Sequence, residues 1–318
     1  MSDRPRSSVA EATALTRMIT LASTGVALLL VSIKGAVWLL GGSTALLASA
    51  ADSALDLLAS LATFFAVRYA ASPPDAEHRF GHGKAEAFAS LLQGGLVFAS
   101  AALIGREAIG DILHPREVTH GGLAIAVMAV SIALTFALIA AQTHVLKRTA
   151  SVAVAGDRAH YATDLASNAV ALLGVGAAAI FGWRGVDAIA ALAIAAFLVW
   201  GAVGVFREAA NQLMDRELPL AERERIIALV TSDPMLSDVH QLRTRASGPY
   251  VHIQMHVDLD PTLSLRQAHA AVVAAERRIL SEFPSADIII HPDPRGAAEP
   301  HGGAFAETTL GKRGLKEG

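Results

Sequence analysis

The chain has 318 residues, of which 53% are hydrophobic and only 17% are charged, whereas roughly 25% of the residues of a soluble domain are charged. It contains no cysteine, which excludes disulfide bonds, thiolate nucleophiles, cysteine zinc sites and iron–sulfur clusters. The formal net charge of −3 includes no basic excess and argues against nucleic acid as a partner.

Charged residues divide the chain into two parts. Residues 1–206 hold 26 of the Asp, Glu, Lys and Arg residues, and the shorter remainder holds 29. The first part is as poor in charge as a membrane domain, and the second has an ordinary soluble composition. We predict an N-terminal tail over 1–15, a membrane domain over 16–206, a soluble domain over 207–294 and a disordered tail over 295–318, which lacks an apolar pattern.

Six stretches of the first part are long and apolar enough to cross a membrane, since a bilayer core of about 30 Å needs roughly 20 helical residues. The last two are separated only by a short turn around Gly182–Gly185 and form a hairpin. The predicted spans are Thr16–Leu40, Thr44–Val67, Ala85–Ile109, Gly121–Val145, Ala155–Phe181 and Val186–Phe206.

Basic residues predict the orientation, because cytoplasmic loops are enriched in Lys and Arg. On one side of the membrane the loops carry only Arg116 and Arg184. The other side carries nine basic residues: Arg4, Arg6, Arg17, Arg68, Arg79, Lys84, Lys147, Arg148 and Arg158. Both termini and the soluble domain are therefore expected in the cytoplasm.

Two spans carry ionisable pairs at membrane depth. Asp52 and Asp56 on the second span, and His160 and Asp164 on the fifth, are each spaced i,i+4 and so share a helix face. An intramembrane carboxylate costs at least about 2.5–3.5 kcal/mol and needs a partner or a wet cavity. One imidazole and three carboxylates suit tetrahedral Zn²⁺, with Fe²⁺, Co²⁺ or Cd²⁺ bound less strongly.

A purely structural role is the alternative for some of these residues. Either pair alone could be a structural hydrogen bond between helices, but two pairs on separate helices favour a cation site. Asp157, one turn before His160, is either an accessory group of the site or a solvated residue at the helix start. Lys34 in the first span either snorkels to the interface or pairs locally.

The first cytoplasmic loop offers a second candidate metal site. Asp75, His78 and His82 lie within eight residues, and Gly81 and Gly83 allow the chain to turn tightly. The alternative is a polar loop that contains two histidines by chance.

The soluble part predicts a small α+β sandwich. Its pattern is helix, strand, strand, helix, strand, over Leu220–Thr231, Asp238–Ala246, Tyr250–Asp260, Ser264–Phe283 and Ala286–His291. His252 and His256 are four apart on a strand and point to one face.

The motifs DSALD, DAEHRFGHGKAEAFAS and HYATD, in this order, resemble the cation diffusion facilitator family, and most of all its bacterial zinc and ferrous-iron efflux branch. The resemblance extends over about residues 12–294. It implies a homodimer that exchanges cytoplasmic divalent metal for protons. Each subunit would have six transmembrane helices and a C-terminal cytoplasmic metallochaperone-like α+β domain.

The resemblance also implies roles for single residues. The transport site would consist of Asp52, Asp56, His160 and Asp164, and the loop site of Asp75, His78 and His82. Lys84 would form a salt bridge with Asp215. A further metal site at the dimer contact would consist of His240, His256, His269, His291 and Asp293. A histidine at the position of His160 favours zinc and cadmium in that family. His252 falls outside the pattern, and Pro292 replaces a glutamine of related proteins, so no side-chain ligand can come from that position.

The function expected from the sequence is proton-coupled export of divalent metal, zinc first, across the inner membrane. Zn²⁺ would be substrate and structural or regulatory ligand, with no catalytic cofactor, and the partners would be protons, lipids and a second copy of the chain. A membrane metalloenzyme is one alternative, but HExxH is absent and four protein ligands leave no position for an activated water. A membrane-anchored metal sensor is the other, and it leaves the intramembrane pairs unexplained.

Overall fold

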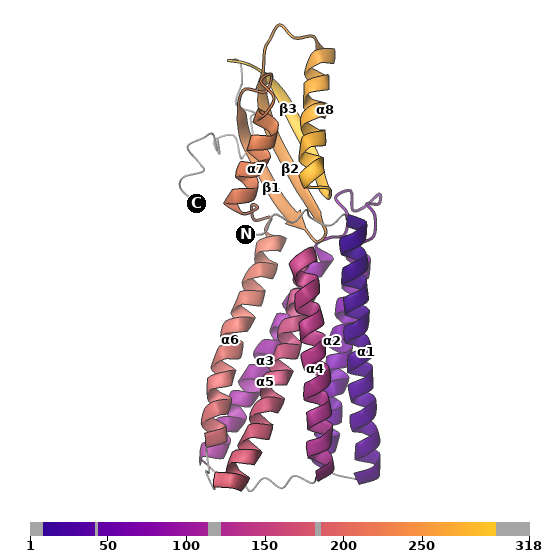
Figure 1. The fold of residues 1–318 in the computed structure, drawn as a ribbon, viewed down its shortest axis with the longest axis vertical. Coiled ribbons are helices and arrows are strands. Elements are labelled where there is room, and N and C mark those ends of the chain that lie inside the picture. Colours follow the sequence, from indigo (N-terminus) through magenta and orange to yellow (C-terminus); the bar gives the residue numbers. More distant parts are fainter. Residues whose placement is uncertain (1–8, 42–43, 114–121, 182–185, 297–318) are drawn as a thin grey trace. The chain divides into compact units, whose positions relative to one another are not determined.

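The structure is a computed structural model that describes residues 9–41, 44–113, 122–181 and 186–296 (Figure 1). The predicted disordered tail lies outside the described residues from position 297 on, as do Arg4, Arg6, Arg116 and Arg184 of the orientation argument. Two compact units make up the chain, one of them Thr13–Ala210 and the other containing everything from Asn211 on. Each unit has its own internal packing.

Six long helices make up the described part of the first unit. They are α1 (Val9–Gly41), α2 (Thr44–Ala70), α3 (Ala85–Leu113), α4 (Gly122–Thr149), α5 (Val152–Phe181) and α6 (Val186–Leu213). Among the described residues, all of these helices except α5 are long and apolar enough by composition to cross a membrane. The 30-residue α5 carries Asp157, His160 and Asp164 and packs against α3, α4 and α2 (Figure 1). The prediction of a multi-pass helical membrane domain is confirmed.

The last helix of this unit runs further than the sequence pattern predicts. It ends at Leu213 rather than at Phe206, because Arg207, Glu208 and Gln212 are good helix formers although they are not apolar. The helix is ended by Asp215, which has a left-handed φ of 57° while the amide of Arg216 bonds back to the carbonyl of Asn211 at 2.9 Å.

The second unit has the predicted α+β order. Helix α7 (Leu220–Thr231) precedes β1 (Val239–Ser247) and β2 (Tyr250–Leu259), and α8 (Leu265–Glu282) precedes β3 (Ala286–Pro294). The sheet has the order β1-β2-β3, with β1 antiparallel and β3 parallel to β2. Strand β3 extends past the expected end at His291, because its pairing with β2 continues to Leu259↔Pro294 and an edge strand tolerates proline.

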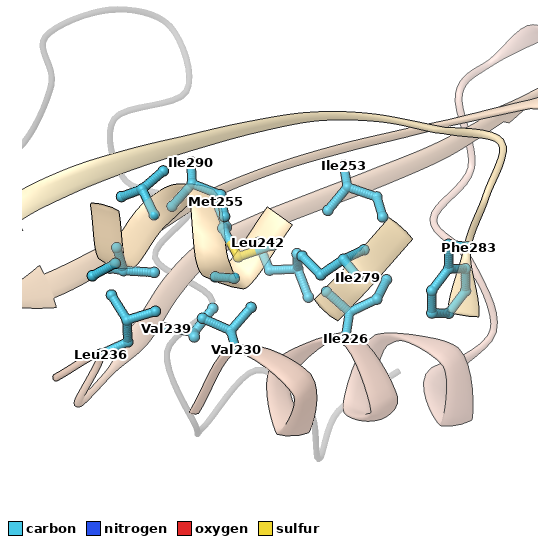
Figure 2. Close-up of a cluster of buried hydrophobic side chains, with 14 of the residues drawn as sticks. Ile226, Val230, Leu236, Val239, Leu242, Ile253, Met255, Ile279, Phe283 and Ile290 are labelled. Atoms are coloured by element: carbon cyan, nitrogen blue, oxygen red, sulfur yellow. The ribbon is translucent and has the colours of Figure 1, made fainter. Parts of the chain in front are cut away.

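Both helices of this unit cover the same face of the sheet. Ile253 and Met255 of β2 are buried against Ile226 and Val230 of α7 and Ile279 of α8 (Figure 2). Because side chains alternate along a strand, the even-numbered residues of β2 point to the face without helices. The histidines of β2 therefore lie on the side of the sheet that the hydrophobic core does not use.

Candidate metal sites

Three potential ligands meet inside the helix bundle. The Nε2 atom of His160 on α5 lies 3.0 Å from Asp56 Oδ1 on α2 and 3.8 Å from Asp164 Oδ2 one turn along α5. His160 is 4% and Asp56 8% exposed. One ligand atom from each of the three residues lies within 4.8 Å of the others. An imidazole and two carboxylates at such distances can bind one divalent cation.

The remaining predicted ligand of this set, Asp52, is not part of the cluster. It lies one helical turn before Asp56, and its side chain is exposed in the single chain. The two residues share a face only approximately, since four residues are slightly more than one turn of 3.6 residues.

The rotation of α5 is held by buried polar contacts and by one close approach. The hydroxyl of Tyr161 lies 2.7 Å from Ser60 Oγ on α2 and donates to the carbonyl of Ser23 on α1 at 3.1 Å. A Cβ atom on Gly156 would lie 3.1 Å from Ser90 Cα on α3, so glycine allows α3 and α5 to touch. These contacts turn His160 toward α2.

Asp157 is not a solvated residue at the helix start. It is 1% exposed, and its two carboxylate oxygens accept hydrogen bonds from Gln93 Nε2 at 3.1 Å and Gln142 Nε2 at 2.8 Å. The same Gln142 amide donates to Ser23 Oγ at 3.1 Å. Asp157 thus joins α3, α4 and α5 one turn from His160, and its role as an accessory group of the site stays a prediction.

The loop between α2 and α3 forms a second cluster. His82 Nε2 lies 3.2 Å from Asp75 Oδ2, and His78 Nδ1 lies 3.4 Å from Asp75 Oδ1. Gly81 has a φ of 78°, which favours glycine and lets the loop fold back. The backbone amide of His78, donating at 2.6 Å, lowers the pKa of Asp75, and the amide of Glu77 adds to this. The carboxylate is thereby kept charged, as a metal ligand must be.

A third cluster lies on the helix-free face of the sheet. Asp293 Oδ2 lies 3.1 Å from His240 Nε2 and 2.9 Å from His256 Nδ1, and Asp293 Oδ1 lies 3.3 Å from His291 Nε2. Cross-strand pairing brings these side chains together, since His240 and His291 are both register partners of His256. Burial by itself raises the pKa of Asp293, but the hydrogen bond from His256 and the charges of His256 and His291 outweigh it and lower the pKa below its ordinary value.

These arrangements agree with a comparison of the sequence with known families. A profile described as the cation efflux transmembrane domain matches residues 20–214, and one described as the cation efflux protein cytoplasmic domain matches residues 218–295. The chain belongs to the cation efflux family.

Relatives match along nearly their whole length. The cation-efflux pump FieF of Salmonella arizonae is 40% identical over 274 residues, which cover 86% of this chain and 91% of that protein. FieF of Salmonella schwarzengrund is 39% identical over 285 residues, or 90% and 95% of the two chains. The metal-bound C-terminal domain of the CzcD transporter from Thermotoga maritima is 27% identical over 25% of this chain and 94% of that one, with a TM-score of 0.25.

Some predicted residues of this family member lie elsewhere. His269 is on the exposed side of α8, whose other side packs on the core, so it does not reach the His240 cluster within one chain. Its assignment to that site stays a prediction. His252 is outside the cluster as expected, and its Nδ1 lies 3.2 Å from Asp287 Oδ2.

The predicted salt bridge between Lys84 and Asp215 also stays a prediction, because the two residues belong to different units. Within its own unit, Asp215 forms an ion pair with Arg245 Nη1 at 3.0 Å.

Sequence reasoning missed the polar residues that surround the intramembrane cluster. Gln93 and Gln142 are both fully buried, and Gln93 Nε2 also donates to Thr63 Oγ1 at 2.9 Å. The presence of a glutamine in an apolar span does indicate such a contact, because its amide must find hydrogen-bond partners inside the bundle.

Proposed function

We propose that this member of the cation efflux family is a proton-coupled antiporter that exports divalent metal from the cytoplasm, rather than an enzyme. Zn²⁺ is the preferred substrate, and Cd²⁺, Fe²⁺ and Co²⁺ are accepted. The observation that carries the proposal is the meeting of Asp56, His160 and Asp164 between two helices of the membrane domain. Ionisable side chains at membrane depth are costly and are typical of ion pathways.

Zinc preference follows from the donor set. Imidazole nitrogen and carboxylate oxygen bind Zn²⁺ in tetrahedral geometry, and thiolates are absent from the chain. We assign the fourth position to Asp52, which lies one helical turn before Asp56 on α2. His160 as the single nitrogen ligand favours zinc over harder cations such as Mn²⁺.

Proton coupling follows from competition for the same atoms. A carboxylate or imidazole binds metal only when it is deprotonated, so metal binding releases protons and protonation expels metal. Facing the cytoplasm, the deprotonated site binds Zn²⁺; facing the more acidic outside, protons displace it. The site stays in place while the helices around it open alternately to the two sides.

The remaining clusters belong to the assembled transporter. We propose a homodimer in the inner membrane with both termini in the cytoplasm. The cluster of His240, His256, His291 and Asp293 binds regulatory or structural zinc at the dimer contact, where His269 joins it. The loop cluster of Asp75, His78 and His82 binds a further ion near the cytoplasmic membrane surface.

The test is zinc transport in proteoliposomes with an imposed pH gradient. Wild-type protein should move Zn²⁺ and protons in opposite directions, and Asp56→Ala should lose this activity while remaining folded. Glu107→Ala is the matched control, because it removes an exposed carboxylate of α3 and should transport at the wild-type rate. Zinc uptake by Asp56→Ala at the wild-type rate would refute the proposed site, and absence of uptake by the wild type would refute the function.

A further inference from the structure

One basic side chain lies inside the helix bundle close to the candidate transport site. Lys34 on α1 is 6% exposed, and its Nζ atom donates to Ser53 Oγ on α2 at 2.7 Å. A lysine in a membrane span usually extends its ammonium group toward the interface, because a buried charge is costly. Lys34 instead points into the bundle.

The hydrogen bond to Ser53 places the ammonium group of Lys34 beside the proposed ligands. Ser53 lies between Asp52 and Asp56 in the sequence, and Ser53 and Asp56 are both buried and three residues apart, hence on one face of α2. Lys34 interacts electrostatically with both Asp52 and Asp164. It therefore adds a positive charge to the site without being able to ligate a metal itself.

The charges of the four proposed ligands and the bound metal balance only when this lysine is counted. Three ionised carboxylates, from Asp52, Asp56 and Asp164, and one divalent cation sum to −1 when the imidazole of His160 is neutral. The ammonium group of Lys34 brings the loaded site to zero. A neutral loaded site avoids carrying an uncompensated charge through the bilayer centre during the change of access.

The same charge repels the substrate. A fixed cation next to a divalent ion weakens its binding, and differences in affinity among related sites reside mostly in the dissociation rate. A transporter must release its substrate as well as bind it, so a site with three carboxylates and no internal cation would hold metal too firmly for fast turnover.

We propose that Lys34 is a fixed counter-cation of the transport site, which limits the affinity for divalent metal and so permits release. The inference rests on the proposed function. Lys34 is a positioning and charge-setting residue, not a ligand.

The test compares zinc KM and turnover in proteoliposomes at pH 8, where proton competition for the ligands is weakest. In Lys34→Gln the KM should fall at least about tenfold, because removing a unit positive charge from beside a divalent ion strengthens the binding of that ion. Turnover should fall as well. Lys34→Arg keeps the charge and should keep the KM within about threefold of wild type.

The matched control is Arg106→Gln. Arg106 is exposed and lies seven residues before the end of α3 at Leu113, as Lys34 lies seven residues before the end of α1 at Gly41. Arg106→Gln should leave the KM unchanged, because its side chain is exposed and not buried beside the ligands as Lys34 is. A merely structural role of Lys34 would lower turnover or yield without lowering the KM.

An unchanged or higher KM in Lys34→Gln would overturn the inference, and so would an equal fall in Arg106→Gln. If Lys34→Gln does not fold, Lys34→Met is measured in its place, because an apolar side chain removes a buried charge from the membrane interior. If neither neutral variant folds, Lys34 serves assembly of the bundle and the inference is wrong. Failure of the wild type to transport zinc would refute the proposed function instead.

Discussion

The imidazole Nε2 of His160 lies 3.0 Å from Asp56 Oδ1, although the two residues are 104 positions apart in the sequence. This contact joins α5 to α2. A divalent cation that enters between the two side chains would replace one hydrogen bond by two bonds to the metal. In the proposed exchange of metal for protons, the same atoms would serve the proton-bound and the metal-bound state.

Replacing the only nitrogen ligand should change metal selectivity. In His160→Asp the proposed site has only oxygen ligands, which suit Mn²⁺ better than an imidazole does. The ratio of Zn²⁺ to Mn²⁺ uptake should fall about tenfold or more, and zinc transport should need a higher pH, because an added carboxylate disfavours joint ionisation. Uptake of both metals in proteoliposomes from pH 6 to 8 measures this. An unchanged ratio would show that selectivity lies outside the ligand set.

A methyl group at Gly156 should separate α3 from α5. In Gly156→Ala the new Cβ would lie 3.1 Å from Ser90 Cα, which is backbone and cannot move cheaply. We expect a destabilisation of about 1–3 kcal/mol, the usual cost of overpacking, and a lower Tm in detergent. Gly25→Ala on α1 is the control, because its Cβ would meet nothing within 4 Å. Equal Tm values for the two variants would contradict the close approach.

The soluble unit should dimerise more strongly with zinc. A fragment from Asn211 to Arg295 contains its whole hydrophobic core, and ligands that bind the assembled state shift the equilibrium toward it. Sedimentation with zinc and with a chelator should show the difference. Asp293→Asn should remove the zinc response, since Asp293 contacts three histidines, whereas Asp287→Asn on the same strand should keep it. A fragment that stays monomeric with zinc would contradict the dimer-contact site.

Asp293 should make the metal-free fragment sensitive to acid. Its pKa is lower in the folded state than the ordinary value of 3.8, so the unfolded chain binds more protons as the pH falls. The contribution of Asp293 is therefore complete above about pH 4 and is lost as the pH falls through the folded-state pKa. Denaturant unfolding of wild type and Asp293→Asn between pH 2 and 6 measures it. The difference in the free energy of unfolding should be largest above pH 4 and should shrink toward pH 2.

Much of this protein could be predicted from its sequence. The length of the apolar stretches predicts the membrane helices, because a helix in contact with lipid must be mostly apolar. Alternation of apolar and polar residues predicts the strands, because one face of a sheet is buried and the other faces water. Spacing of i,i+4 places Asp52 with Asp56 and His160 with Asp164 on shared helix faces, and the loop spacing places Asp75 near His82. These are local relations within one element or one short loop.

Only the tertiary structure decided which of these side chains meet. The rotation of a helix about its axis depends on packing, and here Gly156 against Ser90 and Tyr161 against Ser60 turn α5 toward α2. That rotation brings Asp56 rather than Asp52 to His160.

The same holds for the residues around the clusters. Packing of five helices encloses Asp157 between two glutamine amides and turns Lys34 inward, whereas composition alone leaves either residue free to face water. In the soluble unit, the pairing of three strands gathers His240, His256 and His291, and the covering of the opposite face by α8 keeps His269 away from them. Contacts between segments far apart in the chain depend on the packing of whole surfaces, which no local spacing encodes.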